Sequence, residues 1–64
     1  MTGIDKAIEA AGTQRALARE LGVTQQAISK MKRRGWAYKP QARRIAARYP
    51  EISLDELVNP ADVL

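Results

Sequence analysis

The chain has 64 residues, no cysteine, no histidine and a formal net charge of +4. A chain of this length buries only about 60% of the surface that its unfolded form exposes, so we expect one small domain over residues 1–64. The missing cysteines exclude a disulfide framework and a thiolate zinc site, and with histidine absent the commonest nucleophile, general base and metal ligand are all lacking. We therefore predict a protein that is not an enzyme and uses no cofactor, no metal and no small-molecule substrate.

The sequence contains no run of about 18 apolar residues, so we expect no membrane partner. The first six residues lack the basic start and apolar middle of a signal peptide. The protein is therefore expected to stay in the compartment where it is made.

The charges are divided unevenly along the chain. Residues 14–48 contain ten lysines or arginines and one glutamate, a net charge of +9, whereas residues 1–13 carry −1 and residues 49–64 carry −4, which sum to +4. A basic block between acidic ends predicts one cationic face that meets a polyanion. The alternative is a solvated basic surface without a partner.

Apolar residues recur at helical spacing, and the β-branched and aromatic runs typical of strands are absent, which predicts an all-α fold. The first helix is expected over residues 3–11, with Thr2 and Asp5 at its capped start and Gly12 at its end. Its apolar stripe consists of Ile4, Ala7, Ile8 and Ala11.

Two further helices are expected close together. Thr13 can cap the second helix, which ends at Gly22, and Thr24 can cap the third, which runs to Gly35. Because only Val23 separates Gly22 from Thr24, these two helices should cross steeply. The residues expected to face inward are Leu17, Ala18, Leu21, Ala27, Ile28 and Met31.

Pro40 suits the first turn of a fourth helix, which Pro50 ends. Ser53 and Glu56 have the spacing of a capping box ahead of a short helical turn, and residues 59–60 end that turn. The residues expected to face inward are Ala42, Ile45, Ala46 and Tyr49 on the helix, and Leu54, Leu57 and Val58 on the turn. Residues 61–64 give no clear prediction.

Residues 14–31 have the spacing of a helix-turn-helix. Ala18 lies four residues after Gln14; Gly22 follows Ala18 by four residues, and Ile28 follows Gly22 by six. Ala18 would face the crossing point, where a larger side chain would push the helices apart, and Gly22 can adopt the positive φ of the turn. Because the motif lies inside the basic block, it predicts binding to double-stranded DNA.

On these residues the sequence resembles the Cro and repressor proteins of lambdoid phages and the related small YdaS-type regulators of prophages. The resemblance is close over residues 14–34 and looser over residues 2–58. Residues 12–18 are similar to the opening of phage Cro proteins of this size, and residues 22–28 to the turn and recognition helix of a lambdoid repressor. The family implies a lambda-repressor-like domain of about five helices, whose third helix enters the major groove of operator DNA, in the bacterial cytoplasm and associated with the nucleoid.

The resemblance also implies roles for individual residues. Base contacts are implied for Gln25, Gln26, Ser29 and Lys30, and phosphate contacts for Gln14, Thr24, Lys32, Arg33 and Arg34. A glutamine amide can pair with N6 and N7 of adenine, and Lys30 can donate to guanine O6 or N7. The alternative for the glutamines is that they are exposed helix formers without a ligand.

Helical geometry agrees in part with these roles. The residues opposite the inward face of the third helix are Gln26, Ser29, Lys30 and Arg33, whereas Gln25 lies nearer the side. Three further cations, Lys39, Arg43 and Arg44, can contact phosphates from the fourth helix, while Arg48 is expected to be solvated. Trp36 either packs against the core or a helix end, or stacks on a DNA sugar.

Some Cro proteins end in a β-hairpin, and the helical spacing of residues 53–58 departs from that branch. A dimer made by strand pairing is therefore not expected. A homodimer that is weak, or that forms only on DNA, is expected to use the acidic C-terminal segment. The apolar residues expected at that surface are Leu57, Val58, Val63 and Leu64.

Together these observations predict a sequence-specific transcriptional regulator, a Cro-like repressor of a phage or prophage that binds operator DNA as a dimer. One alternative is an antitoxin or activator that uses the same DNA site and also holds a protein partner. A helical protein-interaction module is a second, although protein interfaces favour aromatic and apolar anchors over the glutamines and lysine of the third helix. RNA binding is a third, and it is disfavoured because no exposed aromatic platform is expected.

Overall fold

The structure, a computed structural model, describes residues 2–62. This part of the chain is all-helical, without a strand, and consists of α1 (Gly3–Ala11), α2 (Gln14–Leu21), α3 (Gln25–Arg34), α4 (Lys39–Arg48) and the 3-10 turns η1 (Leu54–Glu56) and η2 (Pro60–Asp62). The all-α prediction is confirmed. The expected five helices are four in this range, because the segment after α4 forms only the short 3-10 turns η1 and η2. None of the described helices has the length and hydrophobicity needed to span a membrane.

Three threonines begin the first three helices, as predicted. The hydroxyl oxygens of Thr2, Thr13 and Thr24 accept hydrogen bonds of 3.0 to 3.2 Å from the backbone N–H of the third residue of each helix. A threonine cap of this kind stabilises a helix by about 1 kcal/mol. Asp5 completes a capping box on α1 by accepting from the N–H of Thr2 at 3.2 Å. These local contacts explain why the helix starts could be predicted from the sequence.

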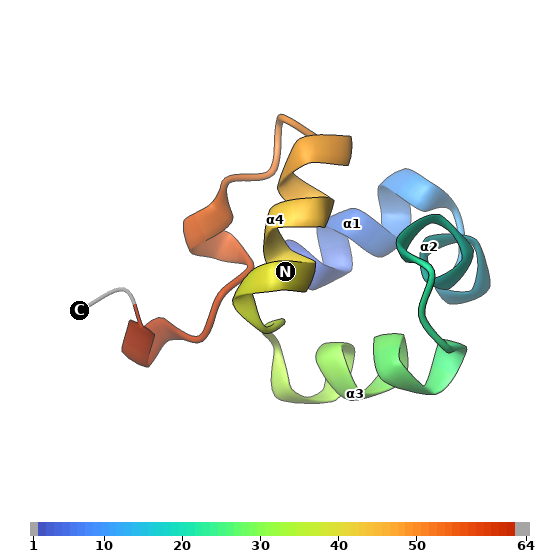
Figure 1. The fold of residues 1–64 in the computed structure, drawn as a ribbon, viewed down its shortest axis with the longest axis horizontal. Helices are drawn as coiled ribbons and strands as arrows, with labels where there is room; N and C mark the ends of the chain where they lie inside the picture. The colour runs from blue at the N-terminus through green and yellow to red at the C-terminus, as the bar shows by residue number, and fades with distance from the viewer. Residues whose placement is uncertain (1, 63–64) are drawn as a thin grey trace.

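Gly22, Val23 and Thr24 connect α2 to α3. Gly22 has φ +70° and ψ 30°, a left-handed conformation that costs other residues roughly 1–2 kcal/mol. Its N–H donates to the carbonyls of Ala18 and Arg19, and this contact closes the last turn of α2. In Figure 1, α2 is seen almost along its axis while α3 runs across the view, so the two helices cross steeply, as predicted.

One apolar core joins the four helices to the segments that follow α3 and α4. Its largest fully buried side chains are those of Ile4, Leu17, Ile28, Met31, Ile45 and Leu57. Among the described residues, no polar or charged side chain is buried. The expected inward position of Leu54 is wrong, because its side chain is 38% exposed. Leu54 begins the single 3-10 turn η1, and the next apolar residues, Leu57 and Val58, occupy the core instead.

The prediction that the apolar residues after α4 form a dimer surface is wrong for Leu57 and Val58. Leu57 and Val58 are 0% and 7% exposed and belong to the core, so they cannot supply that surface. Their helical spacing fits a core position as well as an interface, and contacts distant in sequence decide between the two. Val63 and Leu64, the other residues expected at the interface, lie outside the described residues.

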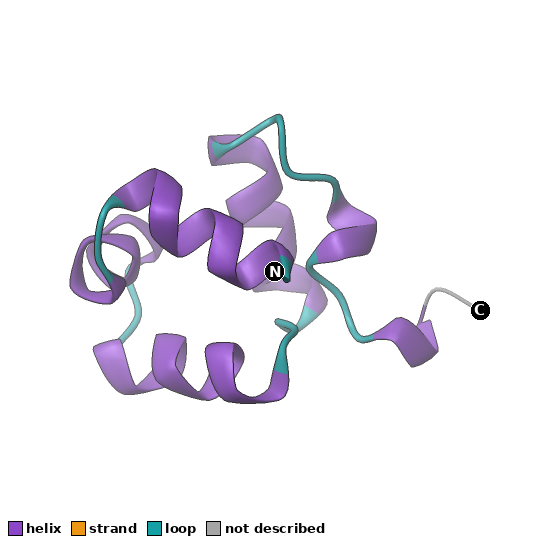
Figure 2. Ribbon diagram, turned by 180° about the vertical axis from the view of Figure 1, so that it is seen from behind, coloured by secondary structure: helices purple, strands orange, loops and turns teal. Residues whose placement is uncertain are grey.

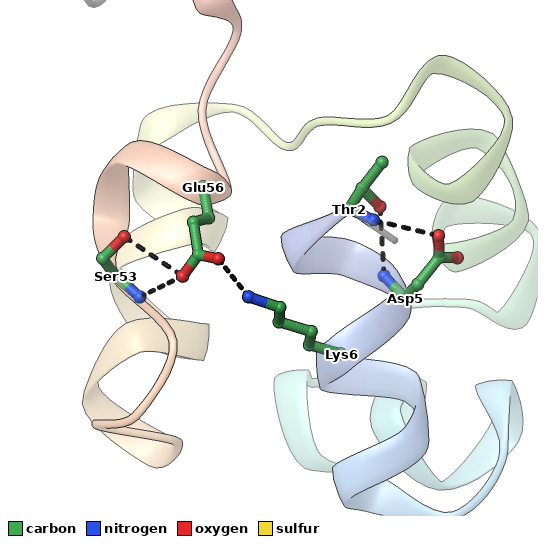
Figure 3. Close-up of polar contacts among 5 residues, drawn as sticks. All are labelled: Thr2, Asp5, Lys6, Ser53 and Glu56. Atoms are coloured by element: carbon green, nitrogen blue, oxygen red, sulfur yellow. Dashed lines mark hydrogen bonds and ion pairs between the residues drawn. The ribbon is translucent and has the colours of Figure 1, made fainter.

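Polar contacts fasten η1 to α1 (Figure 3). The Lys6 ammonium on α1 forms an ion pair with the Glu56 carboxylate, which also accepts from the Ser53 N–H at 3.0 Å and the Ser53 hydroxyl at 3.2 Å. The hydrogen bond from Lys6, followed by the one from the Ser53 backbone, lowers the pKa of Glu56 from 4.5 to about 2. Gly3 lies so close to this turn that a Cβ there would be 2.5 Å from the Glu56 carbonyl oxygen.

Candidate nucleic-acid interface

α3 lies along one edge of the molecule, with α1, α2 and α4 on its inner side (Figures 1 and 2). Ile28 and Met31 anchor it, since both side chains are almost completely buried in the core. Gln26, Lys30 and Arg33 are exposed on the opposite side of the helix. In both views no other described element lies outside α3, so its polar face is open to a partner.

Four side chains of this face surround one shallow hollow of about 340 Å³. Its lining residues are Gln26, Ser29, Lys30 and Arg33. They are the same four that the helical spacing places opposite the buried side. Gln25, the remaining base-reading candidate, is exposed but does not line the hollow. The structure therefore brings together three of the four residues expected to read bases, together with one expected to contact phosphate.

A side-chain hydrogen bond ties this face to α2. The Ser29 hydroxyl donates to Oε1 of Gln14 at 2.8 Å, in a part-buried position between the middle of α3 and the first residue of α2. Gln14 and Ser29 are the two candidate site residues that are half-buried, and the others are exposed. The bond leaves the amide N–H groups of Gln14 for a further acceptor. Sequence reasoning assigned the two residues separately and missed their contact, which spans 15 positions.

The cationic candidates outside the hollow are exposed on α3 and on the first half of α4. Lys32 and Arg34 lie on nearly opposite flanks of α3. They are two positions apart, which on a helix of about 3.6 residues per turn corresponds to a rotation of roughly 200°. Lys39 and Arg43 are exposed on the first half of α4 and do not line the hollow described above. The Thr24 hydroxyl accepts the capping hydrogen bond and keeps its own proton for another acceptor.

Two exposed arginines of α4 make contacts with α2. Arg44 Nη1 donates to the carbonyl of Leu21 at 3.1 Å and thereby satisfies the end of α2. Arg48 is exposed, as expected, and pairs with Glu20 at 3.2 Å; the Tyr49 hydroxyl donates to the same carboxylate. The hydrogen bond from Tyr49 is the main cause of the lowered pKa of Glu20. These contacts fasten α4 to α2, away from the open face of α3.

A second hollow, of about 280 Å³, lies between α3 and the start of α4. Its lining residues are Ala27, Lys30, Met31, Arg34, Tyr38 and Gln41. Arg34 lies over two aromatic rings, with Cζ 4.3 Å from the ring centroid of Trp36 and 4.6 Å from that of Tyr38. The rings meet edge to face, with centroids 5.2 Å apart. Arg34 Nε also donates to the Trp36 carbonyl at 3.0 Å. We call these three residues the Arg34 cluster.

Sequence reasoning missed the role of Tyr38 in this cluster. Trp36 is half-buried and packs on Arg34 at the end of α3, which is the helix-end packing expected as one option. Tyr38 is 60% exposed, and its ring contacts the Arg34 guanidinium and meets the Trp36 ring edge to face. The sequence pattern that could have predicted the cluster is a small residue, Ala37, between two aromatic residues. In an extended segment alternate side chains point to opposite sides, so a buried Ala37 directs both aromatic rings away from the core.

The comparisons with known proteins give the family. The family model described as bacterial toxin YdaS matches residues 4–53, which include nearly all of α1 and the whole of α2, α3 and α4. The chain belongs to the YdaS family. This family of small phage-associated regulators is one of the two that the sequence resembles, so the YdaS-type part of that prediction is confirmed. No curated protein and no solved structure matches the chain.

Proposed function

We propose that this YdaS-family chain is a sequence-specific regulator of transcription that binds double-stranded operator DNA. In this proposal α2 and α3 form a helix-turn-helix, and α3 is the recognition helix. The observation that carries the proposal is the open polar face of α3, with Gln26, Lys30 and Arg33 around one hollow at the edge of the fold. The major groove of B-DNA is about 12 Å wide and admits an α-helix with its side chains.

The hollow holds side chains whose chemistry can distinguish bases. The amide N–H of Gln26 can donate to N7 of adenine while its carbonyl oxygen accepts from the N6 amino group, which makes a bidentate pair. The ammonium of Lys30 can donate to O6 or N7 of guanine. The Ser29 oxygen can still accept a hydrogen bond, and Gln25 reaches the groove from the first turn of the helix. Each well-formed bidentate contact provides about 1–3 kcal/mol of discrimination between base pairs.

The surrounding cations would meet the DNA backbone. Lys32 and Arg34, on opposite flanks of α3, can reach the strands on the two sides of the groove, while Arg33 extends from the hollow. Gln14 offers its amide N–H groups to a phosphate at the first turn of α2, where the helix dipole also favours an anion. The exposed Thr24, Lys39 and Arg43 complete the proposed phosphate contacts.

The proposed mechanism is occupancy of an operator, by a homodimer that is weak or that forms on DNA. A bound domain blocks access to the promoter, which requires no cofactor and no catalytic step. This is the action of a Cro-like repressor of a phage or prophage, working at the nucleoid in the bacterial cytoplasm. An antitoxin or activator would use the same DNA face and add a protein partner.

Selection from random duplexes tests the proposal. The wild type should enrich one sequence, and Gln26→Ala or Lys30→Ala should relax the preference at individual base pairs. Arg33→Ala should weaken binding to all sequences alike and lower the slope of log K against log salt by about 1. Arg48→Ala is the matched control. It also removes one arginine charge, but that arginine forms an ion pair with Glu20 and does not line the α3 hollow. Absence of any sequence preference at every salt concentration would refute the proposal.

A second candidate function follows from the family description, which names a bacterial toxin. In that case the chain would stop growth through a protein target. Expression in a bacterial host separates the two: growth arrest that disappears in Lys30→Ala and Arg33→Ala depends on DNA binding. Arrest that persists in both variants, after their weakened binding to the selected operator has been measured, favours a protein target.

A further inference from the structure

We propose that Trp36 and Tyr38 are positioning residues that hold the Arg34 guanidinium in place to contact a phosphate of the DNA backbone. The inference rests on the proposed function, since it assigns a role within the same DNA interface. It distinguishes Arg34 from its neighbours Lys32 and Arg33, which are exposed on the same helix without an aromatic contact in the described structure.

Arg34 is restrained at several points of its side chain. Nε is fixed by its hydrogen bond to the Trp36 carbonyl, and the guanidinium carbon lies within 4.6 Å of both ring centroids. A cation at this distance over an aromatic face is attracted by the ring quadrupole. An exposed arginine otherwise samples many rotamers and loses that freedom when it binds. In the Arg34 cluster much of the ordering is already present in the free protein.

The backbone that carries the two rings is itself anchored. Ala37, between them, is buried in the core, and its N–H donates to the carbonyl of Leu57 at 2.7 Å. The N–H of Gly35 donates to the carbonyl of Met31 at 2.7 Å, which fixes the exit from α3. Trp36 and Tyr38 therefore project from a segment that is held by backbone hydrogen bonds at Gly35 and Ala37, so the position that they impose on Arg34 is defined by the fold.

The charge of the Arg34 cluster has no counter-ion in the described part of the chain. The two ion pairs found there are Lys6 with Glu56 and Arg48 with Glu20, so neither involves Arg34. The hydrogen bond of Arg34 uses Nε, which leaves both terminal NH₂ groups for an external acceptor. Two parallel N–H donors match the oxygens of a phosphate. Lys30 lines the same hollow and adds a second positive charge.

A double-mutant cycle on Arg34 and Tyr38 tests the inference. The probe is a random-sequence duplex of about 30 base pairs, because a phosphate contact does not depend on sequence. Tyr38→Ala should raise Kd about three- to tenfold with an unchanged salt slope, because Arg34 still reaches the phosphate but must first be ordered. Arg34→Ala should raise Kd at least as much and lower the slope by about 1.

The decisive comparison is Tyr38→Ala in two backgrounds. Its effect should fall below about twofold when Arg34 is already alanine, and should persist when Arg33 is alanine instead. Tyr38→Phe, which keeps the ring, should bind like the wild type. Arg34→Lys, which keeps the charge but not the planar stacking, should resemble Tyr38→Ala. Tyr38 is mostly exposed, and an unchanged helical circular dichroism spectrum verifies that each variant is folded.

Each outcome decides the inference separately from the proposed function. Equal effects of Tyr38→Ala in all backgrounds would mean that Tyr38 contacts DNA itself, and no effect in any background would mean that the cluster is structural only. Either result overturns the inference, even if the wild type selects a specific operator. Coupling between Arg34 and Tyr38 on random duplex supports the inference, even if selection finds no preferred sequence.

Discussion

Replacement of Gly3 by alanine tests how closely the C-terminal segment packs against α1. A Cβ at this position would lie 2.5 Å from the carbonyl oxygen of Glu56, 2.8 Å from its carbonyl carbon and 2.9 Å from its Cβ. The first two are backbone atoms, so a rotation of a side chain cannot relieve the contact. Alanine therefore requires η1 to move away from α1.

Two effects of opposite sign determine the stability of Gly3→Ala. Alanine is favoured over glycine inside a helix by roughly 0.5–1 kcal/mol. Insertion of an extra methyl group into a well-packed contact costs typically about 1–3 kcal/mol. The crowding is the larger effect, so we expect a net loss of about 1 kcal/mol, and at most about 2.5 kcal/mol, in the free energy of unfolding. This is a substantial part of the total of about 3–10 kcal/mol expected for a domain of this size.

Urea unfolding, followed by circular dichroism at pH 7 and at pH 3, measures this effect. Displacement of η1 should also break the contact between Lys6 and Glu56, so Gly3→Ala should lose less stability between the two pH values than the wild type. Gly22→Ala is the control: a Cβ there meets no atom within 4 Å, so its cost comes from φ +70° alone and its acid dependence should remain. A Gly3→Ala variant at least as stable as the wild type would refute the reasoning.

Two further variants test contacts of the same kind. The folded pKa of Glu56, about 2, lies below its usual value of 4.5, so its contribution to stability is complete above pH 4.5 and is lost as the pH falls towards 2. Glu56→Gln should abolish that part of the acid dependence in urea titrations, and a profile unchanged from the wild type would contradict this assignment. Ser29→Ala removes the donor to Gln14 and should cost about 0.5–1.5 kcal/mol of stability. It should also weaken DNA binding without a change in the salt slope, and wild-type affinity would show that the hydrogen bond has no part in binding.

The features predicted correctly from the sequence depend on neighbours in the chain. Thr2, Thr13 and Thr24 cap helices through contacts three residues away, and the apolar stripes specify which side of each helix is buried. The outward face around Gln26 follows from the same periodicity. The burial of Leu57 could not be separated from an interface role, because spacing alone does not reveal which surface covers an apolar residue.

The parts of the candidate site that sequence reasoning missed depend on tertiary contacts. The hydrogen bond from Ser29 to Gln14 forms only because the turn after α2 sets the angle at which α3 crosses it. The Arg34 cluster requires an extended segment after α3, which is anchored to Leu57 at a distance of 20 positions from Ala37. No local pattern of residue types specifies either contact.

The hydrogen bond between the Ala37 N–H and the Leu57 carbonyl has a consequence for where the folding unit ends. The family match stops at residue 53, yet Leu57 and Val58, both in the core, lie beyond it. A fragment cut at residue 53 would lose the two core side chains of Leu57 and Val58 and leave the Ala37 N–H without its acceptor inside the protein. The smallest autonomous unit of this domain must therefore extend at least to residue 58, past the boundary that family similarity alone would suggest.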